Sequence, residues 1–380
     1  MSEIKVNSIK GVGSTDAAIT INNSDGTCTA NITNNLSNRR LTINGAMTIA
    51  QRGDTASVTS GYGGADRFKF DRSGAAVVTL KQDTGDITQG FAKAQRIDVT
   101  TADSSLAAGD YAMLSYRFEG QDLQQLKKGT ANAQQVTLSF HIKSPKTGTH
   151  IVELVDQSNS GRHVNKAYTV SSANTWEKKT VTFPMETSNA ITNDNARRMD
   201  LNWWLAAGST FSSGTLQTNW GADTDANRAV GQVNCMDSTS NDIYITGVQL
   251  EVGSVATDFE HKSFGQELAL CQRYFLRIPS ANASSGYYFL AQGAAHDTNA
   301  FLCNFHFPTT MRSNPSYSTT GSLRAYNGGG LTVSSIIINT SSVAGACLQV
   351  ATSSGLSAKD AVTLGQNNDS DAGVEFSSEL

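Results

Sequence analysis

Four aspartates in the stretch GADTDANRAVGQVNCMDSTSND are the first candidates for chemistry: Asp223, Asp225, Asp237 and Asp242. A retaining glycosidase needs two carboxyl groups about 5–5.5 Å apart, and calcium sites gather carboxylates in one loop. The DTDAN run lacks the glycine at position six and the glutamate at position twelve of an EF-hand loop. A solvated loop is the favoured interpretation, with a metal site and catalysis as alternatives. We predict no catalytic residue and no cofactor, and a structural calcium ion stays possible.

Histidine and cysteine spacing gives no support for a zinc site. The six histidines form no HxxxH or HExxH pair, and the five cysteines are widely spaced and odd in number. Buried free thiols are therefore expected in place of metal ligands or a disulfide framework. No GxSxG nucleophile elbow occurs, and the glycine-rich runs GGADR and YNGGGL lack the strand-to-helix context of phosphate loops. The sequence therefore predicts a protein that is not an enzyme.

Aromatic residues are the remaining candidates, because sugar rings stack on aromatic faces. Two sets are predicted to bind glycan: Trp203, Trp204 and Trp220 in one stretch, and Tyr287, Tyr288 and Tyr326 further along. The adjacent Trp203 and Trp204 must point to opposite faces of a strand, so at most one of them belongs to a core. Buried packing is the competing interpretation for every ring.

Composition excludes several classes of partner. Charged residues are only 16% of the chain, against about 25% in typical globular domains, and the net charge is -4. Such a charge creates no field that attracts nucleic acid or an anionic membrane. No apolar run approaches the length of a membrane helix, and the opening MSEIKVNSIKGVGSTDAAITI lacks the apolar core of a secretory signal. We expect no nucleic-acid partner, no membrane insertion and synthesis in a cytoplasm.

Period-two alternation dominates residues 39–260 and predicts an all-β fold. The run VTLSFHIKS, for example, places Val136, Leu138, Phe140 and Ile142 on one face. About ten such strands with turn-rich connections indicate two packed antiparallel sheets, a jelly roll in particular. A chain of 380 residues also exceeds what one core usually serves.

Four regions are predicted along the chain. They are an N-terminal attachment segment (1–38), a jelly-roll β-sandwich (39–260), a connecting helix (261–278) and a C-terminal β tip domain (279–380). The first region has strand-like runs but too little apolar surface for a core of its own.

The helical run FGQELALCQRYF interrupts this strand-rich sequence. Phe264, Leu268, Cys271 and Phe275 recur at i, i+4, i+7 and i+11, so they form one apolar stripe. A twelve-residue helix is marginal alone and needs packing partners. We predict an oligomer seam along this stripe, and a helix that caps its own domain is the alternative.

Several stretches together resemble a module that recurs in bacteriophage tail fibres and related virion proteins, itself similar to carbohydrate-binding-module jelly rolls. They are LTINGAMTIAQRG, GGADRFKF, YRFEGQDLQQL, QQVTLSFHIKS, WEKKTVTF and ITGVQLEVGSVATDFEHKSFGQELALCQRYF. The resemblance covers residues 38–278 and is most specific from Val248 to Phe275. The opening MSEIKVNSIKG resembles the start of marine cyanophage virion proteins, and FHFPTTMRSNPSYS resembles the stretch that follows the helix in the same proteins. This chain has Met47-Thr48-Ile49 where relatives often have an aromatic residue and an aspartate, so the resemblance by itself does not imply a calcium site here.

The resemblance implies a function. It implies a non-enzymatic virion fibre or receptor-binding protein, a homotrimer, anchored to other virion proteins through residues 1–38. Such a protein would bind a host cell-surface glycan during adsorption. Two alternatives stay open: a structural head-decoration, neck or tail-adaptor fibre, and a glycan-degrading tailspike.

Overall fold

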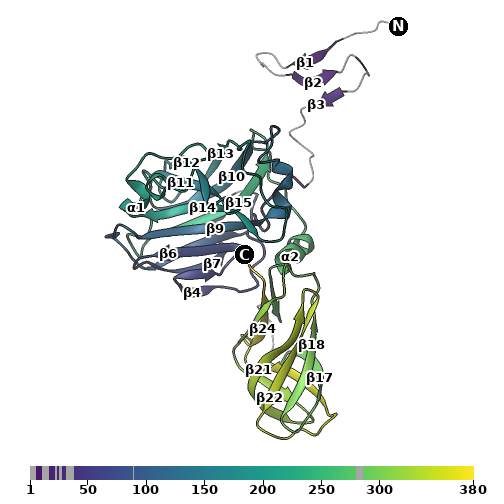
Figure 1. The fold of residues 1–380 in the computed structure, drawn as a ribbon. Coiled ribbons are helices and arrows are strands. Elements are labelled where there is room, and N and C mark those ends of the chain that lie inside the picture. The colour runs from purple at the N-terminus through teal and green to yellow at the C-terminus, as the bar shows by residue number, and fades with distance from the viewer. Residues whose placement is uncertain are drawn as a thin grey trace.

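The computed structural model describes residues 6–10, 17–21, 24, 28–30, 38–88, 90–279 and 286–380. The described chain is all-β apart from short helices, and a β-sandwich is followed by a C-terminal barrel (Figure 1). Near the N-terminus, a small antiparallel sheet contains β1 (Ser8–Lys10), β2 (Ala17–Ile21) and β3 (Cys28–Ala30).

The jelly-roll sandwich consists of two six-stranded antiparallel sheets. The first has the order β13-β10-β15-β8-β7-β4 and the second β12-β11-β14-β9-β6-β5. Their bounds are β4 (Thr55–Val58), β5 (Ser60–Tyr62), β6 (Phe68–Ser73), β7 (Val77–Asp83), β8 (Ala94–Thr101), β9 (Tyr111–Glu119), β10 (Val136–Lys143), β11 (Gly148–Asp156), β12 (Arg162–Val170), β13 (Glu177–Phe183), β14 (Arg197–Ala207) and β15 (Asp242–Val252). Three short helices lie in the connections: η1 (Gly120–Leu126), α1 (Ser209–Ser212) and η2 (Asp225–Asn227).

The predicted alternation builds the core between these sheets. Val136, Leu138, Phe140 and Ile142 of β10 are all fully buried in the inter-sheet core, as expected. Each such side chain stabilises the fold by about 1.5–3 kcal/mol relative to an exposed position. The jelly-roll prediction is confirmed.

One glycine keeps the alternation of β15 in phase with the core. Ile243 and Ile245 face inward at odd positions, whereas Val248 and Leu250 face inward at even ones. The register against β10 shifts at this point, and Gly247 has a φ of 63°. A bulge with a left-handed residue favours glycine, and it returns the next apolar side chain to the core.

Helix α2 (Phe264–Gln272) follows the sandwich and begins with a capping box. The Ser263 hydroxyl accepts from the Gln266 backbone N–H, and the Gln266 side chain accepts from the Ser263 N–H. The helix is held by a buried ion pair between Glu267 and Arg40, not by its apolar stripe alone. It is nine residues long, shorter than predicted, because the chain turns into a strand at Phe275.

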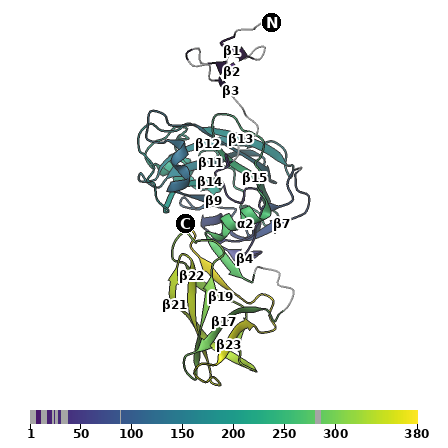
Figure 2. The same cartoon turned by 90° about the vertical axis from the view of Figure 1, so that its right-hand side faces the viewer.

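The C-terminal part contains a barrel and a small sheet (Figures 1 and 2). The closed barrel has the order β17-β18-β22-β21-β20-β23, and the sheet has the order β16-β24-β19. Their bounds are β16 (Phe275–Ile278), β17 (Phe289–Ala295), β18 (Ala300–His306), β19 (Ser316–Thr320), β20 (Leu323–Tyr326), β21 (Gly330–Ser342), β22 (Gly345–Thr352), β23 (Ala361–Gln366) and β24 (Gly373–Ser377). Residues 275–278, predicted as part of the connecting helix, therefore pair as a strand of this sheet.

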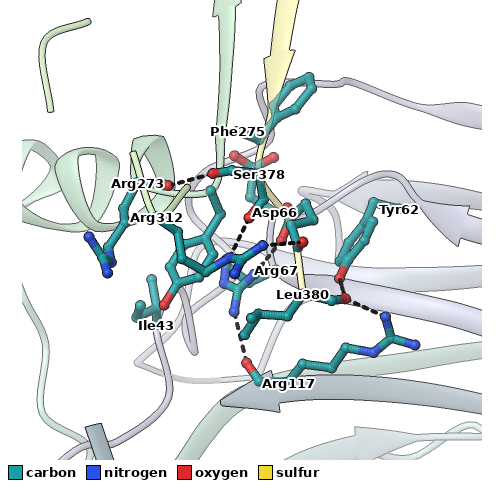
Figure 3. A network of polar contacts seen from close by, with 12 residues as sticks. Ile43, Tyr62, Asp66, Arg67, Arg117, Arg273, Phe275, Arg312, Ser378 and Leu380 are labelled. Atoms are coloured by element: carbon teal, nitrogen blue, oxygen red, sulfur yellow. Dashed lines mark hydrogen bonds and ion pairs between the residues drawn. The ribbon is translucent and has the colours of Figure 1, made fainter. Parts of the chain in front are cut away.

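The end of the chain returns to the junction between sandwich and barrel (Figure 3). Strand β24 pairs with β16, so Ser377 lies opposite Phe275. Arg67, from the loop before β6, forms an ion pair with Glu379 and stacks 3.4 Å from the centre of the Tyr274 ring. The two parts of the molecule are thus joined by buried charged contacts as well as by the chain.

Candidate functional site

The two adjacent tryptophans point to opposite faces of β14, as predicted. Trp203 lies between the sheets, with its ring centre 5.7 Å from that of Phe140. Trp204 lies on the outer face in a cluster with Ile151 and Ala229. Both tryptophans are fully buried, so neither has a ring face free for a sugar. The prediction that they bind glycan is wrong.

A structured loop of residues 208–229, called here the cap, covers Trp204. The Phe211 ring lies 5.4 Å from the Trp204 ring, measured between centres. The backbones of Gly221 and His163 exchange two hydrogen bonds of 3.2 Å, which fasten the cap to edge strand β12. This main-chain pairing keeps the outer tryptophan away from solvent.

Trp220, the third predicted tryptophan, also lies in the cap. Its indole N–H donates to the Pro184 carbonyl at 2.8 Å, and the Lys128 ammonium nitrogen lies 4.9 Å from its ring centre. The ring is half-buried against the core. Its polar edge and one face are therefore already used within the chain.

Beside the cap, the outer face of the same sheet is open. A cavity of about 380 Å³, called here the polar groove, runs over β6, β9, β14 and β11. The side chains that characterise it are Lys69, Asp71, Tyr111, Arg117, Arg197 and Asp200. Strands far apart in sequence bring them together, because β9 lies between β6 and β14 in the sheet order.

Ion pairs fix the donors and acceptors of the polar groove. The Lys69 ammonium lies 2.7 Å from both carboxylate oxygens of Asp71. The Arg197 guanidinium donates to Asp200 at 2.7 Å, and the Gln157 amide donates to the same carboxylate at 2.7 Å. A ligand therefore meets hydrogen-bonding groups that are already oriented, which lowers the entropic cost of binding.

A buried carboxylate links the polar groove to the cap. Glu153 accepts from the Arg228 guanidinium at 2.7 and 2.9 Å and from the Asn202 amide at 2.9 Å. Burial opposes the charge of Arg228, but Glu153 outweighs it and holds the pKa of the guanidinium above its usual value. The pair ties cap and sheet together at the groove wall.

Tyr111 is the aromatic residue of the polar groove, and sequence reasoning missed it. Its ring packs edge-on against Phe211 of the cap, with 5.6 Å between ring centres. Burial raises the pKa of its phenol, and the nearby Asp71 carboxylate raises it further. The alternation in YAMLSYRFE, which places Tyr111, Ser115 and Arg117 on one face of β9, is the signal that could have revealed this site.

The tip aromatics lie at the surface of the barrel. Tyr287 and Tyr288 are 54% and 50% exposed, and Phe289 beside them is 60% exposed. Tyr326 packs edge-on against Phe289 at 5.4 Å, and its hydroxyl donates to the Gln366 carbonyl at 2.8 Å. The prediction that these tyrosines bind glycan stays a prediction, and Phe289 joins them as a residue that the sequence did not indicate.

The predicted oligomer seam is divided by the fold. Phe264 is 64% exposed and Leu268 is partly exposed. Cys271 and Phe275, in contrast, are buried by the chain itself. They cannot contact another subunit, so the predicted seam is wrong for these two residues.

The aspartates of the first candidate set do not gather. Three of them pair with three different cations: Asp225 with Arg228 at 3.5 Å, Asp237 with Lys146 at 2.6 Å and Asp242 with Arg96 at 2.8 Å. Among the residues that the structure describes, no group of three or more His, Cys, Asp or Glu side chains is arranged to hold a metal ion.

No described helix has the length and apolar character to cross a membrane.

Comparison with known proteins finds solved structures that align with part of this chain, at low sequence identity and low TM-score. No family model matches the chain, and no curated protein matches it. The enzymatically active domain of tailspike protein 4 of bacteriophage CBA120 aligns at 14% identity with a TM-score of 0.28, over 52% of this chain but only 21% of the tailspike chain. The family 11 carbohydrate-binding module of a Clostridium thermocellum cellulosomal cellulase aligns at 14% identity with a TM-score of 0.28, over 56% of this chain and 98% of the module. A family 4 carbohydrate-binding module aligns at 12% identity with a TM-score of 0.29, over 55% and 97% of the two chains. These values assign the chain to no family.

Proposed function

We propose that this chain is a non-enzymatic fibre protein of a bacteriophage virion that binds a host cell-surface glycan in the polar groove. The observation that carries the proposal is an open groove whose donors and acceptors are fixed in place on the outer face of a jelly-roll sheet. Sugar hydroxyls both donate and accept, so they can use cationic and carboxylate side chains alternately. The groove volume lies within the range of about 300–1,000 Å³ that is common for ligand sites.

The pairing of the groove carboxylates supports binding without hydrolysis. Asp71 is engaged by Lys69 and Arg117, and Asp200 by Arg197. A glycosidase needs one carboxyl group that can give a proton to the leaving oxygen. The paired cations hold both carboxylates in place as hydrogen-bond acceptors for sugar hydroxyls.

Replacing Arg197 with Ala is expected to weaken glycan binding at least about tenfold, because a hydrogen bond to a charged group contributes about 1.5–3 kcal/mol. An array of bacterial O-antigen and capsular oligosaccharides identifies the ligand, and calorimetric titration measures the affinity. The matched control is Arg198→Ala, since the neighbouring Arg198 pairs with Asp194 and does not line the groove. Binding to no glycan on the array, or equal losses in the two variants, would contradict the proposal.

The proposed assembly is a homotrimer anchored to the virion through residues 1–38. The exposed Phe264 supports association near α2, and the N-terminal strands of three, five and three residues are too short to enclose a core. A chain without residues 1–38 is expected to remain a trimer in sedimentation velocity but to be absent from assembled particles. A monomeric product, or normal incorporation into particles, would refute the corresponding half of this assembly.

A further inference from the structure

Two strand edges in the C-terminal part line one cavity, and no strand among residues 286–380 lies between them. Strand β19 pairs with β24 along one edge, and no strand among residues 286–380 pairs with its other edge. Strand β21 pairs with β20 only as far as Thr332, opposite Arg324. Beyond that residue, no main-chain partner is found on this edge of β21 within residues 286–380. Unpaired edges of this kind are templates for another strand.

A cavity of about 830 Å³, called here the strand slot, separates the two edges. Residues 317–319 of β19 and residues 332–336 of β21 line it on opposite sides. The Tyr317 hydroxyl reaches across and donates to the Ile336 carbonyl, so a side chain takes the place of one ladder hydrogen bond. A strand in the slot would displace this Tyr317 contact and gain main-chain hydrogen bonds on both sides.

The floor and the rim of the strand slot differ in chemistry. Tyr317, Leu323, Val333 and Ile336 form a floor of half-buried apolar side chains that pack on the barrel core. Serine and threonine side chains dominate the rim, and Arg324 is the one charged residue in the slot lining. Apolar side chains on alternate residues of a guest strand would complete the burial of the floor, while the residues between them would face solvent.

We propose that the strand slot is a docking site for one extended segment of a partner protein, which adds as a strand between β19 and β21. The segment alternates apolar with polar residues, and it is neutral or acidic because Arg324, which also donates to the Gly330 carbonyl, is the charged residue of the slot lining. This mode of recognition takes affinity from main-chain pairing and specificity from alternate side chains. An oligosaccharide is a poorer fit, since it has no backbone amides to pair with the two strand edges. The proposal is independent of the polar groove.

Selection from a display library of random nonapeptides on the full chain tests the proposal. The enriched peptides are expected to show period-two apolar residues and no excess of Lys or Arg. Ile336→Lys, in the floor, should weaken their binding at least about tenfold in fluorescence anisotropy, because it places a charge against apolar side chains. Ile337→Lys is the matched control, since Ile337 points out of the same strand and is exposed. It should change the affinity less than about twofold.

Hydrogen exchange on the unmodified chain gives a test that needs no variant. Bound peptide should protect amides of β19 and β21, and N-methylation of alternate peptide amides should abolish this protection, because it removes ladder donors. Enriched peptides without alternation, or equal binding to wild type and Ile336→Lys, would overturn the proposal. So would protection of the same amides by maltohexaose and not by any peptide.

Discussion

Replacing Lys128 with Met is expected to lower the free energy of unfolding of the jelly roll by about 3–5 kcal/mol. The Lys128 side chain is fully buried. Its ammonium nitrogen lies 2.6 Å from Asp156, 3.1 Å from Glu186 and 2.7 Å from the Asn189 carbonyl. Methionine fills a similar volume but supplies no charge, so the fully buried Asp156 carboxylate would lose its cation. Removing one partner of a buried pair costs far more than the pair itself contributes.

The measurement is the urea midpoint of unfolding, followed by tryptophan fluorescence. The control is Lys81→Met, because Lys81 also pairs with an aspartate, Asp98, at 2.8 Å but is 31% exposed. Its loss should cost less than about 1 kcal/mol. Equal midpoints for the two variants would show that the Lys128 cluster is not a buried charge site.

Replacing Arg67 with Met is the second change with a large expected effect, about 3 kcal/mol at the junction between sandwich and barrel. The buried Arg67 guanidinium donates to the Arg117 carbonyl at 2.8 Å and pairs with Glu379 (Figure 3). Burial opposes its charge, yet the Glu379 carboxylate, with a smaller contribution from the Tyr274 phenol, holds its pKa well above the usual value. Methionine would remove the ion pair and the ring contact together.

Limited proteolysis should locate this effect. The variant is expected to be cut faster than wild type on either side of α2, because the junction opens before the sandwich core unfolds. Arg96→Met is the control, since Arg96 pairs with Asp242 on the sheet surface at 2.8 Å and lies away from the junction. If Arg67→Met is cut near α2 no faster than wild type and Arg96→Met, Arg67 does not hold the junction together.

The fold was largely predictable because apolar and polar residues alternate along each strand, and this pattern can be seen within a short stretch of sequence. The inward face of β10, from Val136 to Ile142, is buried as expected, and Trp203 and Trp204 do point to opposite faces of β14. What alternation cannot predict is what covers an outer face. Trp204 is buried by the cap, whose path depends on single main-chain contacts such as that between Gly221 and His163.

Long-range partners explain the remaining differences. The helix prediction placed Phe264 and Phe275 on one apolar stripe at an oligomer seam. The fold instead buries Glu267, because Arg40, 227 residues away in sequence, supplies its counter-charge. The polar groove was missed for a similar reason. Its residues come from strands whose adjacency is set by the sheet order, which the spacing of residues along the chain does not reveal.

The pairing of β16 with β24 bears on whether the C-terminal barrel can be exchanged for another domain. The chain enters the C-terminal part at Phe275 and leaves it at Ser377, and these two residues lie opposite each other. Such neighbouring ends are what makes an inserted domain exchangeable. In the C-terminal part, Arg67 and Arg117 contact residues next to these ends: Tyr274 on one side and residues 379–380 on the other. The barrel can therefore vary its surface, or be replaced by another tip of similar end spacing, while these contacts to the sandwich stay the same.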